Sequence, residues 1–289
     1  MLEVGSGNHP FARSDVLCDL YTGNTSHRVL GDYHPPLVAD RPFVCGDAQK
    51  LPFRSNSFDY LISSHTIEHL DRPQDFLKEA ARVAKRGCII APSRVWEMTF
   101  GVEPHRWMLK RDGTRLIIEP KGQKGKDWQL FGNAFHDAWL NNRDFHSFYY
   151  SDMGRDLFEI WYEYEDGRID FEMDLEHTVG VEHPDQRDSP VALDSNVNLS
   201  QVHFEYMPHK ERAMREVRSL LSGAIRAMYS PKQVDLLSLL ACPICEGNIS
   251  IVGDSFKCSD CARCYPMRGN IPILTENAAV LIQGAATTE

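Results

Sequence analysis

The 289-residue sequence predicts an α/β fold built on a parallel sheet, with a small metal-binding unit near its C-terminal end. Two observations predict the sheet. Short apolar segments alternate with turn residues, and a glycine or an aspartate closes or follows each of the first three segments. Two Cys-x-x-Cys pairs predict the metal-binding unit. With 42% hydrophobic and 25% charged residues, the chain has the composition of a globular protein that can bury a full core.

Five short apolar segments are predicted as strands, and the last two flank a predicted helix over 72–87. This helix has apolar residues such as Phe76, Leu77 and Ala80 at helical spacing, and it ends at Gly87. Strands that alternate with helices form a parallel sheet, which binds ligands at the carboxyl ends of its strands. The predicted strands are residues 1–4, 15–20, 42–45, 58–64 and 87–93.

Residues suited to a nucleoside follow the first three strands. Gly5 and Gly7 allow the backbone to turn tightly and to approach a ligand without a Cβ in the way. Asp19 closes the second strand, where a carboxylate can accept both hydroxyls of a ribose. Asp47 closes the third strand, where it can accept a hydrogen bond from an adenine amino group.

With these residues in this order, residues 1–93 resemble class I S-adenosylmethionine-dependent methyltransferases. The shared motifs are Glu-x-Gly-x-Gly at Glu3–Gly7, the acidic Asp19, the segment Asp47–Phe53 and the stretch FDYLISSHTIEHL. The resemblance implies a Rossmann-like, doubly wound sheet that ends in an antiparallel hairpin, with S-adenosylmethionine bound across the first four strand ends. The implied cofactor-binding residues are Glu3, Gly5, Ser6, Gly7, Asp19, Leu20, Asp47, Ala48 and Ser64.

Two features depart from this family pattern. His9 stands at the usual third glycine, and the connection from Gly7 to the second strand is too short for a full first helix. A non-catalytic adaptor with a degenerate donor site is therefore an alternative to an enzyme. Calorimetric titration with S-adenosylmethionine distinguishes the two.

Histidines follow the fourth strand. His65, Glu68 and His69 have the spacing of one helical face and resemble the divalent-metal site of small-RNA 2′-O-methyltransferases and ubiquinone-pathway O-methyltransferases, with His65 in place of a glutamate. The alternative is that Glu68 and His69 only cap and pack a helix. Because an oxygen nucleophile benefits from a base with a pKa near neutrality, His65 and His105 are the predicted catalytic residues.

The segment 96–150 is rich in aromatic residues and predicts a substrate-covering insertion, or the core of an inserted lobe. Aromatic faces among polar side chains favour O-methylation of a small hydroxylated or saccharide-type acceptor. The formal charge of −10 argues against a nucleic-acid partner, although methylation of RNA or of a translation factor is an alternative. The segment LFEIWYEYEDGRIDFEMDLEH predicts the antiparallel hairpin.

The pairs Cys242/Cys245 and Cys258/Cys261 are 12 residues apart, which leaves room for a short hairpin and predicts a tetrahedral structural Zn²⁺ site. Disulfides are not expected, because the N-terminus lacks a secretory signal. Residues 240–275 resemble the small zinc-binding activator subunit of several class I methyltransferases, through CPIC, CSDC, the Tyr-Pro pair and GNIPIL. The resemblance implies a stabilising partner, here fused in cis.

These observations divide the chain into four parts: a methyltransferase domain with its substrate cover over 1–180, a lid and helical linker over 181–239, a zinc-binding domain over 240–276 and a tail over 277–289. The sequence contains neither a secretory signal nor an apolar run long enough to span a membrane, which predicts a cytoplasmic location. The expected partner is a small-molecule or saccharide acceptor, and a homodimer is left open.

Overall fold

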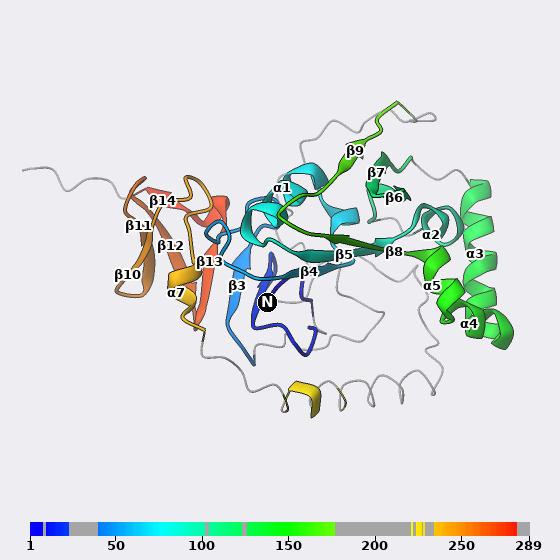
Figure 1. The fold of residues 1–289 in the computed structure, drawn as a ribbon, viewed down its shortest axis with the longest axis horizontal. Coiled ribbons are helices and arrows are strands. Elements are labelled where there is room, and N and C mark those ends of the chain that lie inside the picture. The colour runs from blue at the N-terminus through cyan, green and yellow to red at the C-terminus, as the bar shows by residue number, and fades with distance from the viewer. Residues whose placement is uncertain are drawn as a thin grey trace, which may run out of the picture.

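The computed structural model describes residues 1–7, 10–22, 40–101, 104–122, 126–176, 221, 224–226, 228 and 234–281. Most of these residues are organised around one 11-stranded sheet, in the order β10-β11-β12-β13-β3-β2-β1-β4-β5-β8, with β14 paired to β12 (Figure 1). A second sheet has the order β6-β7-β9. The expected α/β fold class is confirmed.

The five predicted strands form the parallel centre of the sheet. Their residues are almost entirely buried, because helices and connecting segments cover both faces of a central parallel sheet. Their order, β3-β2-β1-β4-β5, brings the carboxyl ends of β1 and β2 next to each other, with those of β3 and β4 on either side. The bounds are β1 (Leu2–Val4), β2 (Val16–Asp19), β3 (Phe43–Gly46), β4 (Leu61–Ser64) and β5 (Gly87–Pro92).

The predicted helix between β4 and β5 is also present, as α1 (Pro73–Val83). Pro73 lies in the first turn of α1. Backbone N–H groups in a first turn form no hydrogen bond within the helix, so the N–H that proline lacks is not needed there. Its apolar face buries Phe76, Leu77 and Ala80 against the sheet. The helix ends at Ala84, whose backbone is extended and leads into β5.

The antiparallel hairpin expected at the edge of the sheet is only half correct. β8 (Glu159–Tyr164) pairs antiparallel with β5, but β9 (Phe171–Met173) leaves the sheet and pairs with β7 (Arg115–Pro120). The Tyr162 hydroxyl donates to the backbone oxygen of Asp170 at 3.1 Å and accepts from its N–H at 3.0 Å. The Tyr162 side chain thus forms hydrogen bonds with the N–H and C=O of Asp170, which in a longer hairpin would pair with the backbone of β8. β7 also pairs with β6 (Trp107–Asp112).

The aromatic-rich segment forms a helical lobe beside β8, at the right of Figure 1. Its aromatic rings pack on one another, and Phe100 contacts the rings of Phe135, Phe145, Tyr149 and Phe158. These rings therefore pack mainly on one another, and each described aromatic side chain of 96–150 keeps some exposed surface. The helices are α2 (Arg94–Thr99), α3 (Lys126–Asn141), α4 (Arg143–Tyr149) and α5 (Asp152–Phe158).

The C-terminal strands continue the same sheet. β13 (Ile271–Leu274) pairs parallel with β3, with Ile273 opposite Cys45 and Leu274 opposite Gly46. The predicted short hairpin is present as β10 (Ile249–Val252) and β11 (Ser255–Cys258). The remaining elements here are α7 (Leu236–Leu239), β12 (Arg263–Arg268), η2 (Glu276–Ala278) and β14 (Val280–Leu281).

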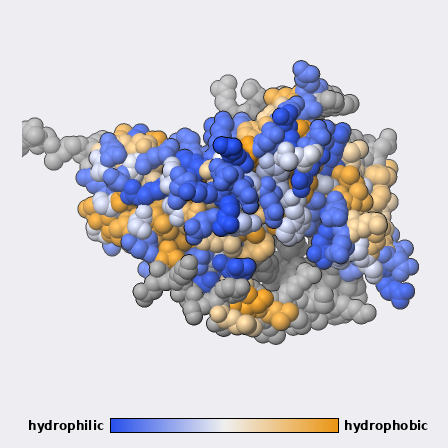
Figure 2. All heavy atoms as spheres, viewed as in Figure 1, coloured by the Kyte–Doolittle hydropathy of each residue, from blue (hydrophilic) through white to orange (hydrophobic). Residues whose placement is uncertain are grey.

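The C-terminal strands and the central sheet share one hydrophobic core. The buried side chains of Leu240, Tyr265 and Leu274 belong to the same cluster as Phe53. The Ala241 N–H also donates to the Pro52 oxygen at 3.0 Å. Figure 2 shows apolar surface at both ends of one face, over the C-terminal strands and over the helical lobe. Most of the lid and linker expected over 181–239 lies outside the described residues.

Candidate functional site

A glycine turn follows β1 and lies against the segment after β4. Gly5 has a φ of 72°, and its N–H donates to the Cys18 oxygen at 2.8 Å. A Cβ on Gly5 would stand 1.9 Å from the Thr66 hydroxyl oxygen, a distance that no side chain can occupy. Glycine is therefore required here both by the positive φ and by the close approach of Thr66.

Asp19 at the end of β2 holds the other half of this turn. Its Oδ2 accepts from the Gly7 N–H at 3.0 Å, and its Oδ1 accepts from the Tyr21 N–H at 3.0 Å. A Cβ on Gly7 would meet none of the described atoms within 4 Å, so the described part of the chain leaves space beside the turn. The buried Ser6 hydroxyl has no hydrogen-bond partner among the described residues. Open space, a carboxylate and an unsatisfied hydroxyl fit the sugar side of a nucleoside.

Glu3 supports the loop that replaces a first helix. Its side chain is buried, and it accepts hydrogen bonds from the Phe11 N–H at 2.9 Å and from the Ser14 hydroxyl. Burial raises the pKa of Glu3 to about 7, even though these two hydrogen bonds lower it. The described contacts of Glu3 are thus with the protein, and contact with the cofactor remains a prediction. His9 lies outside the described residues.

The remaining predicted cofactor residues lie at the ends of neighbouring strands. Asp47 accepts from the Gln49 N–H at 2.8 Å, which holds the turn after β3. Ala48 is buried behind this turn, whereas the Leu20 side chain is 41% exposed after β2. Ser64 is half-buried at the end of β4. The strand order places all of them along one rim of the sheet.

Buried titratable groups gather at the carboxyl ends of β4 and β5. Glu68 lies in η1 (Ile67–His69), is fully buried, and has its Oε1 3.5 Å from His65 Nδ1. Burial lowers the pKa of His65, but the neighbouring Glu68 carboxylate outweighs this effect and the net shift is upward. Glu68, His69 and His105 form a set of metal-type ligands here, with one atom of each within 4.8 Å of the others. The expected set contained His65 in place of His105.

Glu97 and Lys121 complete this cluster and were missed from the sequence. His105 Nδ1 hydrogen-bonds to Glu97 Oε1, and Lys121 Nζ lies 2.7 Å from Glu97 Oε2. Glu97 lies in α2 and Lys121 follows β7, so only the fold brings them together. No motif or spacing in the sequence signals this contact. Trp96 stacks on the His105 ring, with 5.5 Å between the ring centroids.

The four predicted zinc ligands converge at the C-terminal hairpin. Cys242 Sγ lies 3.6 Å from Cys261 Sγ, and Cys245 Sγ lies 3.5 Å from Cys258 Sγ. Sulfurs at the corners of a zinc tetrahedron lie about 3.8 Å apart, whereas a disulfide requires about 2.05 Å. The buried Tyr265 hydroxyl lies 3.0 Å from Cys242 Sγ and can fix that thiolate. The cluster therefore fits a closed four-sulfur zinc site.

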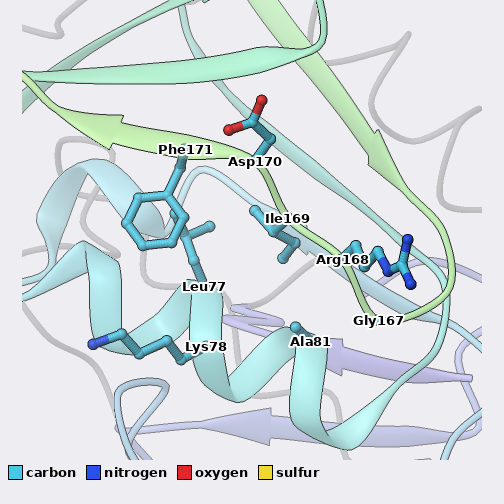
Figure 3. A pocket seen from close by; sticks show the side chains of 8 residues that line it. All are labelled: Leu77, Lys78, Ala81, Gly167, Arg168, Ile169, Asp170 and Phe171. Atoms are coloured by element: carbon cyan, nitrogen blue, oxygen red, sulfur yellow. The ribbon is translucent and has the colours of Figure 1, made fainter.

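A separate open depression lies between α1 and the segment after β8 (Figure 3). The turn at Gly167 follows the end of β8 that pairs with the start of β5, so the depression lies away from the strand carboxyl ends. Its Asp170 is already paired with Arg115 at 3.0 Å. It is not part of the candidate site. Its lining residues are Leu77, Lys78, Ala81, Gly167, Arg168, Ile169, Asp170 and Phe171.

The parallel sheet and its rim define the class of Rossmann-like, nucleoside-binding α/β proteins. Within that class, residues 2–91 match the family model described as "Methyltransferase domain". The resemblance of 1–93 to class I S-adenosylmethionine-dependent methyltransferases is thereby confirmed for this segment.

Individual relatives match over short segments. A 2-methyl-6-phytyl-1,4-hydroquinone methyltransferase from Oryza sativa is 33% identical over 86 residues, which are 29% of this chain and 22% of that protein. A ubiquinone/menaquinone biosynthesis C-methyltransferase from Cereibacter sphaeroides is 51% identical over 51 residues, 17% of this chain and 20% of that protein. The matches thus span about a fifth of these relatives' length.

Among solved structures, the chain is similar to part of a complex between the Haloferax volcanii Trm112 methyltransferase activator and a methyltransferase. The identity is 18% and the TM-score is 0.23, over 31% of this chain and 43% of that one. No helix among the described residues has the length and apolar character needed to cross a membrane.

Proposed function

We propose that the chain is an S-adenosylmethionine-dependent methyltransferase that methylates a hydroxyl oxygen of a small hydroxylated or saccharide-type acceptor. One observation carries this proposal: the Gly5–Gly7 turn after β1 lies beside Asp19 at the end of β2, and no described atom lies within 4 Å of a Cβ placed on Gly7. The histidine and carboxylate cluster lies at the adjoining end of β4, where an acceptor would meet the methyl group.

The rim residues have separate roles in holding the cofactor. Asp19 would accept hydrogen bonds from the ribose hydroxyls, beside those that its carboxylate takes from the Gly7 and Tyr21 N–H groups. Asp47 would accept from the adenine amino group, and the exposed Leu20 side chain would contact the base. S-adenosylmethionine supplies a methyl group on a sulfonium, which is a good leaving group. The protein then mainly has to align the acceptor.

In the transfer, a lone pair of the acceptor oxygen forms the new C–O bond as the S–CH₃ bond breaks, and the bonding electrons pass to sulfur. The acceptor O–H bond also breaks, and its proton needs a base. His65 is suited to this role because its side chain is 50% exposed at the rim beside Glu68. His105 is nearly buried and held by Glu97, so it acts as a positioning residue.

The zinc site and its strands brace the methyltransferase sheet. Parallel pairing of β13 with β3 covers an edge that would otherwise expose unpaired backbone groups. That edge strand carries Asp47 at its carboxyl end. The activator-like segment would therefore stabilise the cofactor rim from within the same chain, and zinc would supply folding free energy to it.

The test is incubation of the full chain with methyl-labelled S-adenosylmethionine and separate panels of small phenols, saccharides, RNA and protein. We expect label in an O-methyl product of a small acceptor, identified by its NMR methyl shift. Asp59→Asn should keep this activity, because Asp59 is exposed and precedes β4, at the opposite end of that strand from the candidate site. Label on RNA or protein alone, or on carbon, would contradict the proposed acceptor class.

A further inference from the structure

The cluster after β4 has the composition of a metal site. Glu68 and His69 lie in η1, and His105 lies just before β6. The Arg106 N–H donates to the Glu68 backbone oxygen at 2.7 Å and fixes the two segments together. The His69 and His105 rings meet edge to face, with 4.6 Å between their centroids. Three ligand atoms, one from each residue, are thus held within 4.8 Å of one another.

The Glu68 carboxylate lacks the hydrogen bonds that a buried charge requires. It has no exposed surface, and neither of its oxygens accepts a hydrogen bond from any part of the chain that the structure describes. The His65 nitrogen at 3.5 Å is beyond ordinary hydrogen-bond distance for a charged pair. Burying a charged group without such partners is strongly unfavourable. A cation between Glu68 and the two histidines would compensate this charge.

His105 is oriented as metal-binding histidines commonly are. Its Nδ1 is hydrogen-bonded to Glu97, which leaves Nε2 as the nitrogen that can bind a cation. Glu97 is itself fully buried and held by Lys121. A carboxylate behind a ligating imidazole fixes its ring and tautomer and raises its basicity as a ligand.

We propose that Glu68, His69 and His105 bind a divalent transition-metal cation, and that this cation holds the acceptor hydroxyl. Two imidazole nitrogens and one carboxylate favour such ions over Mg²⁺ or Ca²⁺. Atoms bound to one cation at about 2.1 Å lie about 3 to 4 Å apart, which is within the 4.8 Å that limits the separation of these three atoms. Three protein ligands leave positions open for a hydroxyl, whose pKa the cation lowers. This role deepens the proposed function and rests on it.

The experiment uses the full chain with its four cysteines loaded with zinc, and Mn²⁺ as the probe. Mn²⁺ prefers nitrogen and oxygen ligands to thiolates, so the cysteine site does not compete for it. Binding is followed by loss of the free Mn²⁺ electron paramagnetic resonance signal. We expect one Mn²⁺ per chain, binding at least about 100-fold weaker in Glu68→Gln, and about 10- to 100-fold weaker in Glu97→Gln. Glu163→Gln, an exposed glutamate on β8, is the matched control.

Absence of Mn²⁺ uptake by the wild-type chain would overturn the proposal. Uptake that persists unchanged in folded Glu68→Gln and His105→Ala would overturn it as well. Glu97→Gln provides a second reading if either ligand variant fails to fold. Calorimetric binding of S-adenosylmethionine on the same samples reports separately on the proposed function. If the chain bound S-adenosylmethionine but no Mn²⁺, the metal site would be rejected while the proposed cofactor site would stand.

Discussion

The Thr66 hydroxyl oxygen lies only 1.9 Å from the position that a Cβ on Gly5 would take. Gly5 closes the turn after β1, and Thr66 begins the segment that carries Glu68 and His69. The cofactor turn and the proposed acceptor site are therefore packed directly against each other. A change at either residue should be felt at the other.

Gly5→Ala should destabilise the fold and abolish cofactor binding, because alanine meets both a positive φ and the Thr66 side chain. We expect a loss of about 2 to 4 kcal/mol in the free energy of unfolding, measured with urea. Gly7→Ala is the matched comparison: its φ is also positive but no described atom is in the way, so it should cost about 1 kcal/mol. Thr66→Ala should partly rescue Gly5→Ala. Equal losses of unfolding free energy in Gly5→Ala and Gly7→Ala would contradict a role for the close contact between Gly5 and Thr66.

Glu3 should make stability fall with rising pH. Its pKa rises from 4.5 to about 7 on folding, so the folded chain binds the proton more tightly than the unfolded chain. This stabilisation is complete below pH 4.5 and is lost as the pH rises to about 7. Its size is on the order of 3 kcal/mol for a carboxyl this well buried.

Glu3→Gln should remove that dependence, because glutamine cannot ionise and can still accept from the Phe11 N–H. Urea unfolding from pH 4.5 to pH 7.5 measures it, with Glu163→Gln as an exposed control. A pH profile in Glu3→Gln identical to the wild-type profile would show that Glu3 is not the group responsible.

Loss of one zinc ligand should lower the stability of the chain more than it lowers the intrinsic catalytic activity. Cys242→Ser should lower zinc content, melting temperature and soluble yield, because Cys242 is buried in the shared core and bonded to Tyr265. Cys264→Ser, outside the four-sulfur cluster, should keep one zinc per chain. Zinc analysis and thermal melting check both variants. A Cys242→Ser protein with normal zinc content and melting temperature would refute the assignment.

The pairing of β13 with β3 should be required for a soluble chain. Leu274→Asp places a charge at a fully buried position beside Gly46, and should cost at least about 3 kcal/mol. It should also expose the β3 edge and promote association, visible by sedimentation velocity. Ile251→Asp is the control, because Ile251 is 53% exposed on β10. Comparable behaviour of the two variants would argue against bracing by β13.

The local features of this fold were predictable from the sequence. The five central strands and α1 follow from short apolar runs and helical spacing, which depend on neighbouring residues alone. The convergence of Cys242, Cys245, Cys258 and Cys261 also follows from their spacing.

Long-range pairings were not predictable. The addition of β13 to β3 joins residues more than 220 positions apart, and the contact between Glu97 and His105 depends on how α2 packs beside β6. Likewise, the alternation of apolar and polar residues in β9 predicts the second strand of a hairpin. In the structure, the Tyr162 hydroxyl hydrogen-bonds to the backbone of Asp170, and β9 pairs with β7 instead. Such choices are decided by tertiary packing, which sequence periodicity does not report.

The most direct measurement is calorimetric titration of the full chain with S-adenosylmethionine. We predict one binding site per chain. The affinity should be about 10- to 100-fold weaker in Asp19→Asn, which loses the carboxylate but can still accept a hydrogen bond from the Gly7 N–H. Asp59→Asn should bind as the wild-type chain does. If the wild-type chain bound no S-adenosylmethionine, or if Asp19→Asn bound it with unaltered affinity, the proposed cofactor site at the strand ends would be wrong.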